Sequence, residues 1–180
     1  MSQNYLKLDS QLCFRLYTAS RLITHIYTPW LEELGLTYPQ YLTLMVLWEK
    51  DGQLVGDISK KLNLDTNTTT PMLKRMEACK LITRTQGTVD RRQIIIRLTE
   101  KGIKLKEKCT NIPVQMIDRL LCYNSNVDEL GTLTKSLDAF IKTLKKIAED
   151  DRQNALEEKK EQKRKNRKKL GNSDSEQSPK

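Results

Sequence analysis

The sequence lacks the long apolar runs of a membrane protein, an amino-terminal signal segment and any cluster of histidines. Its longest apolar stretches, such as Leu44–Trp48, fall far short of the ~20 residues with which a helix crosses a bilayer. Met1–Lys7 has no apolar core of the kind that directs secretion. Histidine occurs once, as His25, which excludes a histidine-rich metal centre and argues against a Ser-His-Asp hydrolase. We therefore expect a cytoplasmic protein without a metal or other cofactor, and we expect His25 at the surface or at an interface.

Cysteine is scarce too, and no two of the four cysteines form a CxxC pair. The wide spacing argues against zinc knuckles and thioredoxin-like motifs. In a cytosolic chain such cysteines are buried thiols by default, and a reactive one needs surroundings that stabilise its thiolate. Judged from its neighbours Leu12 and Phe14 alone, Cys13 is a small core residue. The other three are Cys79, Cys109 and Cys122.

Positive charge, in contrast, is abundant. Lysine and arginine total 32 against 23 acidic residues in 180, a formal net charge of +9. This balance favours a nucleic-acid partner, although a basic tail alone could produce it. The length predicts one domain, residues 1–150, followed by a charged tail, residues 151–180. Within the tail we expect Lys159–Lys169 to be frayed helix or coil and Gly171–Lys180 to be disordered. The tail is either simply solvated or a non-specific contact for DNA.

Apolar residues spaced three and four apart predict that most of the domain is helical. The second predicted helix is apolar almost all round, which indicates that it is buried. Asp51-Gly52 should end it. The predicted helices are Leu12–Trp30 with Asp9 as its N-cap, Tyr41–Trp48 after Pro39, Val55–Leu62, and one that begins after the N-cap Asp65 and ends near Lys80.

The periodicity then changes to that of strands. Leu81–Thr85 and Gln93–Thr99 are rich in β-branched residues and flank a polar segment, which predicts a hairpin with a long tip. Helix resumes at Glu100–Cys109, and Pro113 should kink or divide the helical segment there. The last apolar stripe, Leu130–Ile147, repeats with a period near 3.5. It covers either the chain's own core or a second subunit.

The order of helix, short helix, turn, helix and hairpin is that of a winged helix-turn-helix. The predicted fold is therefore mainly α with a small β-hairpin, with long amino- and carboxy-terminal helices for dimerisation. On the fourth helix one face should pack inward, and short polar side chains on the other face suit base edges in a major groove. The inward residues are Thr69, Met72, Leu73 and Met76, and the outward ones are Asn67, Thr68, Thr70 and Lys74.

Several motifs carry a family resemblance. Asp90-Arg91-Arg92 followed by Leu98–Gly102 resembles the wing signature D-x-R…L-T-x-x-G of the MarR family of regulators. Leu8–Phe14, Leu36–Leu42 and Thr70–Glu77 are similar to the OhrR-type subgroup, which responds to organic hydroperoxides. The resemblance covers about residues 5–150. It implies a DNA-binding repressor rather than an enzyme, acting as a homodimer on a pseudo-palindromic operator in double-stranded DNA.

The resemblance, together with the polar face of the fourth helix, implies a set of DNA-binding residues. Lys74 and Arg75 should meet phosphates. Arg92 matches the wing arginine, whose guanidinium can enter a narrow minor groove, and Asp90 should hold the shape of the wing. The family usually shows D-S-G where this chain has Asp65-Thr66-Asn67, a difference that bears on base preference. The whole set is Asp65, Thr66, Asn67, Thr68, Thr70, Lys74, Arg75 and Arg92.

The resemblance also makes Cys13 a sensor. In the OhrR type a reactive cysteine is oxidised by hydroperoxide, and two tyrosines of the partner subunit, matched here by Tyr27 and Tyr38, donate hydrogen bonds to it. Members with a second cysteine form a disulfide between subunits, which makes Cys122 a possible resolving residue. Cys79 and Cys109 are expected to be packing residues.

Other functions are compatible with these residues. The chain could be a MarR-type regulator that responds to a small phenolic ligand, or a broad regulator of virulence or stress genes. A thiol peroxidase is disfavoured, because the P-x-x-x-T-x-x-C pattern of peroxiredoxins is absent around Cys13.

Overall fold

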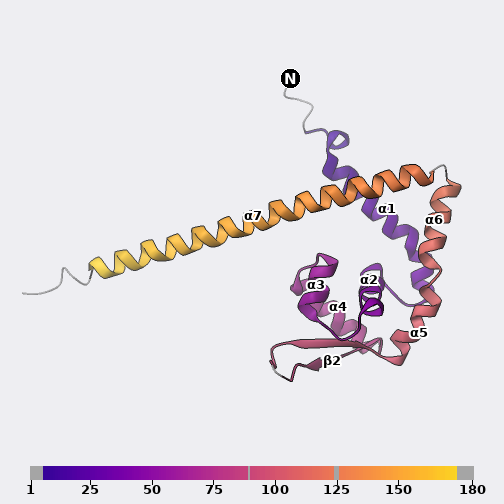
Figure 1. Cartoon of the computed structure of the whole chain (residues 1–180), viewed down its shortest axis with the longest axis horizontal. Coiled ribbons are helices and arrows are strands. Elements are labelled where there is room, and N and C mark those ends of the chain that lie inside the picture. The colour runs from indigo at the N-terminus through magenta and orange to yellow at the C-terminus, as the bar shows by residue number, and fades with distance from the viewer. Residues whose placement is uncertain (1–5, 89, 124–125, 174–180) are drawn as a thin grey trace, which may run out of the picture. The chain divides into compact units, whose positions relative to one another are not determined.

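A computed structural model of the chain describes residues 6–88, 90–123 and 126–173, and side chains as far as residue 162. The chain divides into two units, residues 1–120 and 121–180. The elements are η1 (Leu8–Ser10), α1 (Leu12–Glu33), α2 (Tyr38–Glu49), β1 (Gln53–Leu54), α3 (Val55–Leu62), α4 (Thr66–Ala78), β2 (Ile82–Gln86), β3 (Ile94–Leu98), α5 (Glu100–Cys109), α6 (Ile112–Cys122) and α7 (Val127–Ser173) (Figure 1). The mainly helical winged helix-turn-helix predicted from the sequence is confirmed.

The start of α1 differs from the prediction. Asp9 is not its N-cap, because Asp9 lies inside the short 3-10 helix η1. An N-cap must be an extended residue directly before the first helical one. Gln11 meets that condition with φ −84° and ψ 122°, so α1 begins immediately after it.

Helix α2 forms the centre of the first unit. It begins at Tyr38 rather than at Tyr41, because Pro39 fits the first helical turn, where a backbone N–H has no partner within the helix. The side chain of Gln40 accepts a hydrogen bond from the Thr37 N–H at 2.9 Å, which caps the start. As predicted, the helix is buried on several sides. Its buried residues are Tyr41, Thr43, Leu44, Val46 and Leu47.

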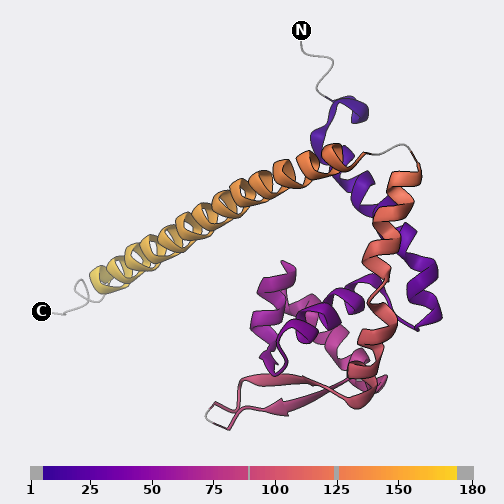
Figure 2. The same ribbon diagram turned by 45° about the vertical axis from the view of Figure 1, so that its right-hand side comes forward.

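Helices α3 and α4 form the helix-turn-helix, packed against each other and, through α3, against α2 (Figure 2). The turn depends on Asn63, which takes the left-handed conformation with φ +52° and lets Leu64 N donate to Ser59 O at 2.9 Å. Asp65 is the N-cap of α4 by position, but its side chain makes no capping bond. Helix α4 ends at Ala78, two residues before the predicted end.

The hairpin pairs as predicted, with Ile82 opposite Leu98 and Gln86 opposite Ile94. The sequence did not reveal a third strand. β1 pairs antiparallel with β3, so the sheet order is β1-β3-β2. Two residues are too few to show a strand periodicity. The Asp51 carboxylate supports this edge by accepting a hydrogen bond from Leu98 N at 2.9 Å.

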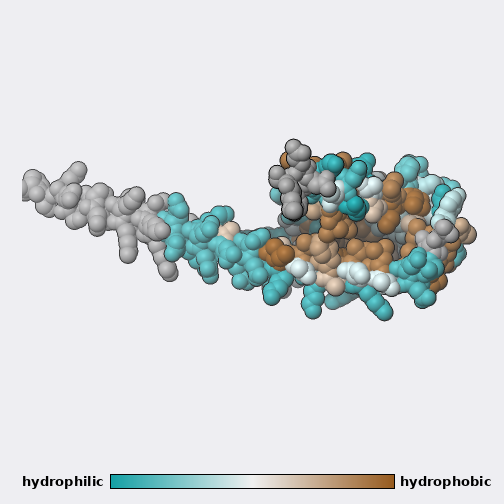
Figure 3. All heavy atoms as spheres, turned by 90° about the horizontal axis from the view of Figure 1, so that it is seen from above, coloured by the Kyte–Doolittle hydropathy of each residue, from teal (hydrophilic) through white to brown (hydrophobic). Residues whose placement is uncertain are grey.

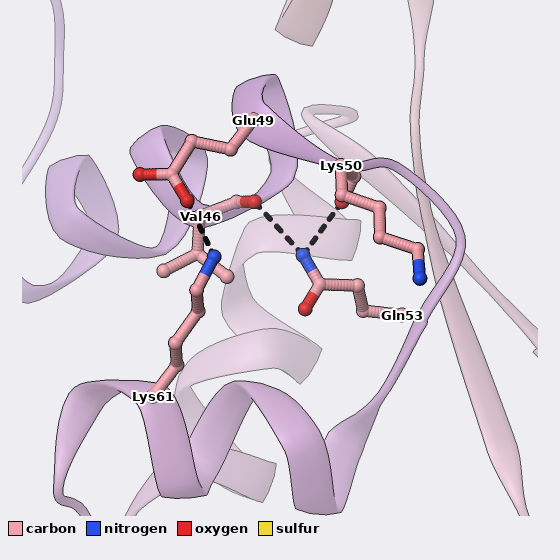
Figure 4. Close-up of polar contacts among 5 residues, drawn as sticks. All are labelled: Val46, Glu49, Lys50, Gln53 and Lys61. Atoms are coloured by element: carbon pink, nitrogen blue, oxygen red, sulfur yellow. Dashed lines mark hydrogen bonds and ion pairs between the residues drawn. The ribbon is translucent and has the colours of Figure 1, made fainter.

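Two side-chain contacts fix the helix-turn-helix to the end of α2. Figure 4 shows the Gln53 amide donating to the carbonyl oxygens of Val46 and Lys50, at 2.8 and 2.6 Å. It also shows Lys61 of α3 paired with Glu49 of α2. These contacts lie just before α3 and near its last residue, so both ends of α3 are linked to α2.

Helices α5, α6 and α7 complete the chain. Pro113 is the second residue of α6, so it divides this region as expected. Helix α7 crosses residue 150 without a break, and the backbone of Lys159–Lys169 is helical within it. The prediction of disorder for Gly171–Lys180 is wrong for residues 171–173, which form the end of α7, and residues 174–180 lie outside the described residues. In the part of the chain that the structure describes, no helix combines the length and apolar content needed to cross a membrane.

Candidate DNA interface and thiol sensor

Most of the residues predicted to contact DNA from α4 and its cap are accessible. Asp65, Thr66, Asn67 and Thr68 are exposed at the start of the helix, and Thr70 is half-buried. One turn further along, the cationic side chains of Lys74 and Arg75 are exposed as well. The start of α4 therefore presents short polar groups and its later turns present positive charge, an arrangement that suits bases and phosphates respectively.

The opposite face of α4 holds the helix in place. Met72, Leu73 and Met76 belong to the buried core, as predicted. Thr69 is fully buried and satisfies its hydroxyl by donating to Asp65 O at 3.1 Å. The hydroxyl of Thr43 on α2 lies 3.9 Å from the Met72 sulfur. Because this face is packed on α2, the exposed face has a fixed orientation.

The tip of the hairpin has a defined shape. The Asp90 carboxylate accepts a hydrogen bond from Arg92 N at 2.9 Å, and the Asp90 carbonyl accepts one from Gln93 N at 3.0 Å. Gly87 is needed here, because a Cβ at this position would lie 2.8 Å from Asp90 O. Asp90 thus shapes the wing, as expected, and leaves the side chain of Arg92 exposed.

A link between α4 and the wing is not apparent from the sequence. Glu77, near the end of α4, accepts a hydrogen bond from Arg84 N on β2 at 3.2 Å. Its other oxygen lies 3.5 Å from the Arg84 guanidinium. This pair joins the two elements that are expected to contact DNA. No spacing rule marks it, because the two residues meet only after the chain has turned between helix and strand.

Cys13 is exposed at the second residue of α1. The start of a helix carries a partial positive charge, which stabilises a nearby anion such as a thiolate. Arg15 donates from its guanidinium to Gln11 O at 3.3 Å, so its side chain is held along the first turn. Cys13 is therefore not the small core residue that its apolar neighbours suggest.

Tyr27 and Tyr38 lie together, with ring centroids 5.0 Å apart. Burial raises the pKa of both phenols, and for Tyr27 the neighbouring Tyr38 adds to the effect. Both hydroxyls therefore stay protonated and able to donate at neutral pH. Cys13 lies fourteen residues before Tyr27 on the same helix, which is about 21 Å at 1.5 Å per residue. One chain thus brings the tyrosines together but leaves Cys13 out of their reach.

The other candidate residues divide into buried and exposed. Cys109 is 2% exposed, which confirms its packing role, and burial raises the pKa of its thiol. Cys79 was expected to pack as well, but it is exposed. It follows Ala78 at the end of α4, beyond the last buried residue of that helix, Met76. Cys122 is exposed at the end of α6, and His25 is exposed on α1, in line with the surface or interface position expected for it.

Large apolar side chains remain exposed on three long helices. A folded chain rarely leaves such a surface open to water unless a partner covers it. On α1 and α6 they are Leu12, Tyr17, Leu22, Ile23, Val114 and Ile117, and on α7 they are Val127, Leu133, Ile141, Leu144, Ile147 and Leu156.

The comparisons with known proteins agree with this geometry. Residues 25–109 match the family model of the transcriptional regulator SarA/Rot. The chain is 43% identical over 141 residues to the organic hydroperoxide resistance transcriptional regulator of Bacillus subtilis (strain 168), an alignment that covers 78% of this chain and 94% of that protein.

Two solved structures of AbfR, a protein known from Staphylococcus epidermidis, are similar as well. Reduced AbfR bound to DNA has a TM-score of 0.63 and 35% identity, covering 80% of this chain and 99% of that one. Disulfide-formed AbfR has a TM-score of 0.54 and 34% identity, covering 79% and 92%.

Proposed function

Since the chain belongs to the MarR family of transcriptional regulators, and within it to the OhrR-type subgroup, we propose that it is a homodimeric repressor that releases its operator when an organic hydroperoxide oxidises Cys13. The chain is a DNA-binding transcriptional regulator, not an enzyme. The proposal adds the effector, the sensor residue, the assembly and the direction of control.

One observation carries the proposal: two protonated phenols lie side by side, out of reach of their own chain's Cys13. A hydrogen bond to a thiolate favours the charged, reactive form. In a homodimer, Tyr27 and Tyr38 of one chain would supply such bonds to Cys13 of the partner subunit. The exposed apolar surface of α1, which also carries Cys13, supports a subunit contact at this place. AbfR, solved in reduced and disulfide-formed states, supports a redox switch on this fold.

The proposed reaction balances without a cofactor. The Cys13 thiolate attacks the terminal oxygen of the hydroperoxide ROOH, forming an S–O bond as the O–O bond breaks. The alkoxide takes up one proton and leaves as the alcohol ROH. Sulfur loses two electrons, which reduce the peroxide, and Cys13 becomes a sulfenic acid.

The sulfenic acid has two routes to a disulfide. A second thiol attacks the Cys13 sulfur, an S–S bond forms, and the hydroxyl leaves as water. The attacking thiol is either Cys122 of the partner subunit or a small cellular thiol. Replacing Cys122 with serine separates the routes, because only the first produces a covalent dimer on a non-reducing gel.

In the proposed complex with DNA, the exposed start of α4 lies in a major groove. Lys74 and Arg75 contact phosphates, and Arg92 of the wing reaches the adjacent minor groove. Oxidation shifts the two recognition helices of the dimer relative to each other, so that they no longer fit two grooves at once. The operator is a pseudo-palindrome with half-sites about one helical turn apart, roughly 10 base pairs.

The deciding experiment is an operator-binding titration with and without cumene hydroperoxide. We expect oxidised wild type to lose about 5–150-fold in affinity, the usual range of allosteric coupling. Cys13→Ser should bind the operator and ignore the oxidant, whereas Cys79→Ser, which removes another exposed thiol, should behave like wild type. Release of DNA by oxidised Cys13→Ser would contradict the sensor assignment and favour a regulator that responds to a small ligand.

The tyrosines give a second arm of the same test. Tyr27→Phe and Tyr38→Phe each keep the ring and remove a donor. Each variant should react at least about tenfold more slowly with hydroperoxide, since a hydrogen bond to a charged group contributes about 1.5–3 kcal/mol. Both should bind operator normally when reduced. Tyr17→Phe is the matched control, because Tyr17 is an exposed tyrosine on the same helix as Tyr27.

A further inference from the structure

Four aromatic rings form a continuous row within the first unit. We call Tyr27, Tyr38, Tyr41 and Trp48 the aromatic row. Tyr27 and Tyr38 are 5.0 Å apart between ring centroids, and Tyr41 lies 6.2 and 6.5 Å from them. Tyr41 in turn meets Trp48 edge-on at 6.4 Å and 68°. The row therefore leads from α1 along the length of α2.

The far end of the row is bonded to the base of the wing. The Trp48 indole N–H donates to Gly102 O at 2.9 Å. Gly102 is packed so tightly on Leu81 that a Cβ there would lie 2.2 Å from the Leu81 carbonyl oxygen. Thr99 joins the same junction, because its hydroxyl donates to Lys80 O at 2.6 Å and accepts from Gly102 N at 3.1 Å. The residues that follow α4, the start of β2 and the end of β3 therefore meet at this point.

We propose that the aromatic row couples the state of the partner subunit's Cys13 to this junction. Trp48 is the positioning residue, and it acts through Gly102. The inference rests on the proposed function, because the first two rings of the row are the tyrosines assigned there to the sensor. It adds the route by which a change at the sensor reaches the DNA-contacting elements.

The packing of the row explains why it transmits a displacement. Tyr41 is 3% exposed and belongs to the core, so its ring is enclosed by other side chains. Burial, helped by the neighbouring Cys109, raises the pKa of Tyr41 to about 12, which keeps it uncharged. A close-packed interior transmits strain rather than absorbing it. When Tyr27 and Tyr38 follow an oxidised Cys13, Tyr41 and Trp48 must shift with them, and the indole N–H moves Gly102.

The test is Trp48→Phe, which keeps an aromatic ring against Tyr41 and removes the N–H donor. Trp30→Phe is the matched control, since Trp30 contacts Tyr27 and the Arg119 guanidinium but is not part of the aromatic row. For each variant we would measure the rate of Cys13 oxidation, the operator Kd when reduced, and the ratio of oxidised to reduced Kd.

For Trp48→Phe we expect an unchanged oxidation rate and an unchanged reduced Kd. The ratio of oxidised to reduced Kd should fall by about fivefold or more, the lower limit of typical allosteric coupling. Trp30→Phe should keep the wild-type ratio. A merely structural role for Trp48 would change the reduced Kd and leave the ratio intact, and that result would overturn the proposal.

A second measurement decides the question if Trp48→Phe folds poorly. The chain has two tryptophans, so in Trp30→Phe the emission comes from Trp48 alone. Hydroperoxide should shift that emission, and the shift should vanish when Cys13→Ser is added. An emission that ignores oxidation while the operator is released would overturn the coupling and leave the proposed function standing. Wild type that keeps its operator on oxidation would overturn both.

Discussion

The two units of the chain differ in where their stability comes from. The first unit has its own core, with Leu44, Leu73 and Ile96 fully buried. No described side chain of α7 is buried, although the helix runs for 47 residues. The geometry that contacts one DNA half-site is therefore built within a single chain. In the proposed dimer, the spacing of two half-sites would depend on helices whose apolar side chains are exposed in the single chain.

Helix α7 itself has two contrasting parts. Its amino-terminal part carries the apolar stripe predicted from the sequence over Leu130–Ile147, with Leu137 and Phe140 half-buried. Beyond the stripe the helix is rich in charged residues, and on the face seen in Figure 3 its described side chains form a mainly hydrophilic surface. The first part therefore exposes apolar side chains that a partner surface would cover, whereas the second exposes mainly charged side chains that water solvates.

The largest expected effect comes from breaking the stripe. Leu137→Asp combined with Leu144→Asp places two charges where the proposed homodimer buries apolar side chains. Sedimentation should then show a monomer, and operator affinity should fall at least about a thousandfold, toward the level of non-specific binding. The first unit should keep its fold, because its core does not include these residues.

The matched control is Lys145→Asp with Ser136→Asp, which places two acids on exposed polar positions of the same helix. These changes should leave the dimer intact. A wild-type chain that sediments as a stable folded monomer at micromolar concentration would contradict the proposed assembly.

An intermediate effect is expected from the wing, which belongs to the self-sufficient unit. Arg92→Ala should weaken operator binding by about 1–3 kcal/mol. It should also lower the slope of log K against log salt concentration by about one, the equivalent of one lost contact. Arg91→Ala removes the same charge one residue away, so the difference between the two variants isolates the groove contact from general electrostatics. Equal affinities and salt slopes for both variants and wild type would show that the wing does not contact DNA.

The sequence predicted best those features that repeat within one element. The inward face of α4 and the pairing of the hairpin follow from helical and strand periodicity, and the positions of Leu73 and Ile96 confirm both. It failed where an element spans no more than one period of its own repeat. β1 has two residues, and η1 has three, enough to remove Asp9 from the predicted cap.

Contacts between distant elements were also beyond the sequence. Trp48 and Gly102 are 54 residues apart, and nothing in the spacing of either suggests a hydrogen bond between them. The exposure of Cys79 likewise depends on where α4 ends against its neighbours. The pairing of Tyr27 with Tyr38 was expected only through the family resemblance, because the two residues lie on different helices.

The smallest effect is expected from the charged end of α7. Residues 151–180 lie outside the apolar stripe, and every described side chain among them is exposed, so the operator complex should not depend on them. A chain ending at Asp150 should bind the operator with nearly unchanged affinity. Its affinity for a scrambled duplex should fall and vary less with salt, because each lost phosphate contact lowers the slope by about 0.9.

Replacing the eight lysines and arginines of residues 159–169 with glutamine keeps the length and should reproduce the truncation. Anisotropy titrations of both duplexes over a salt series would measure this, and a truncated dimer that loses only specific binding would assign the tail a part in operator recognition.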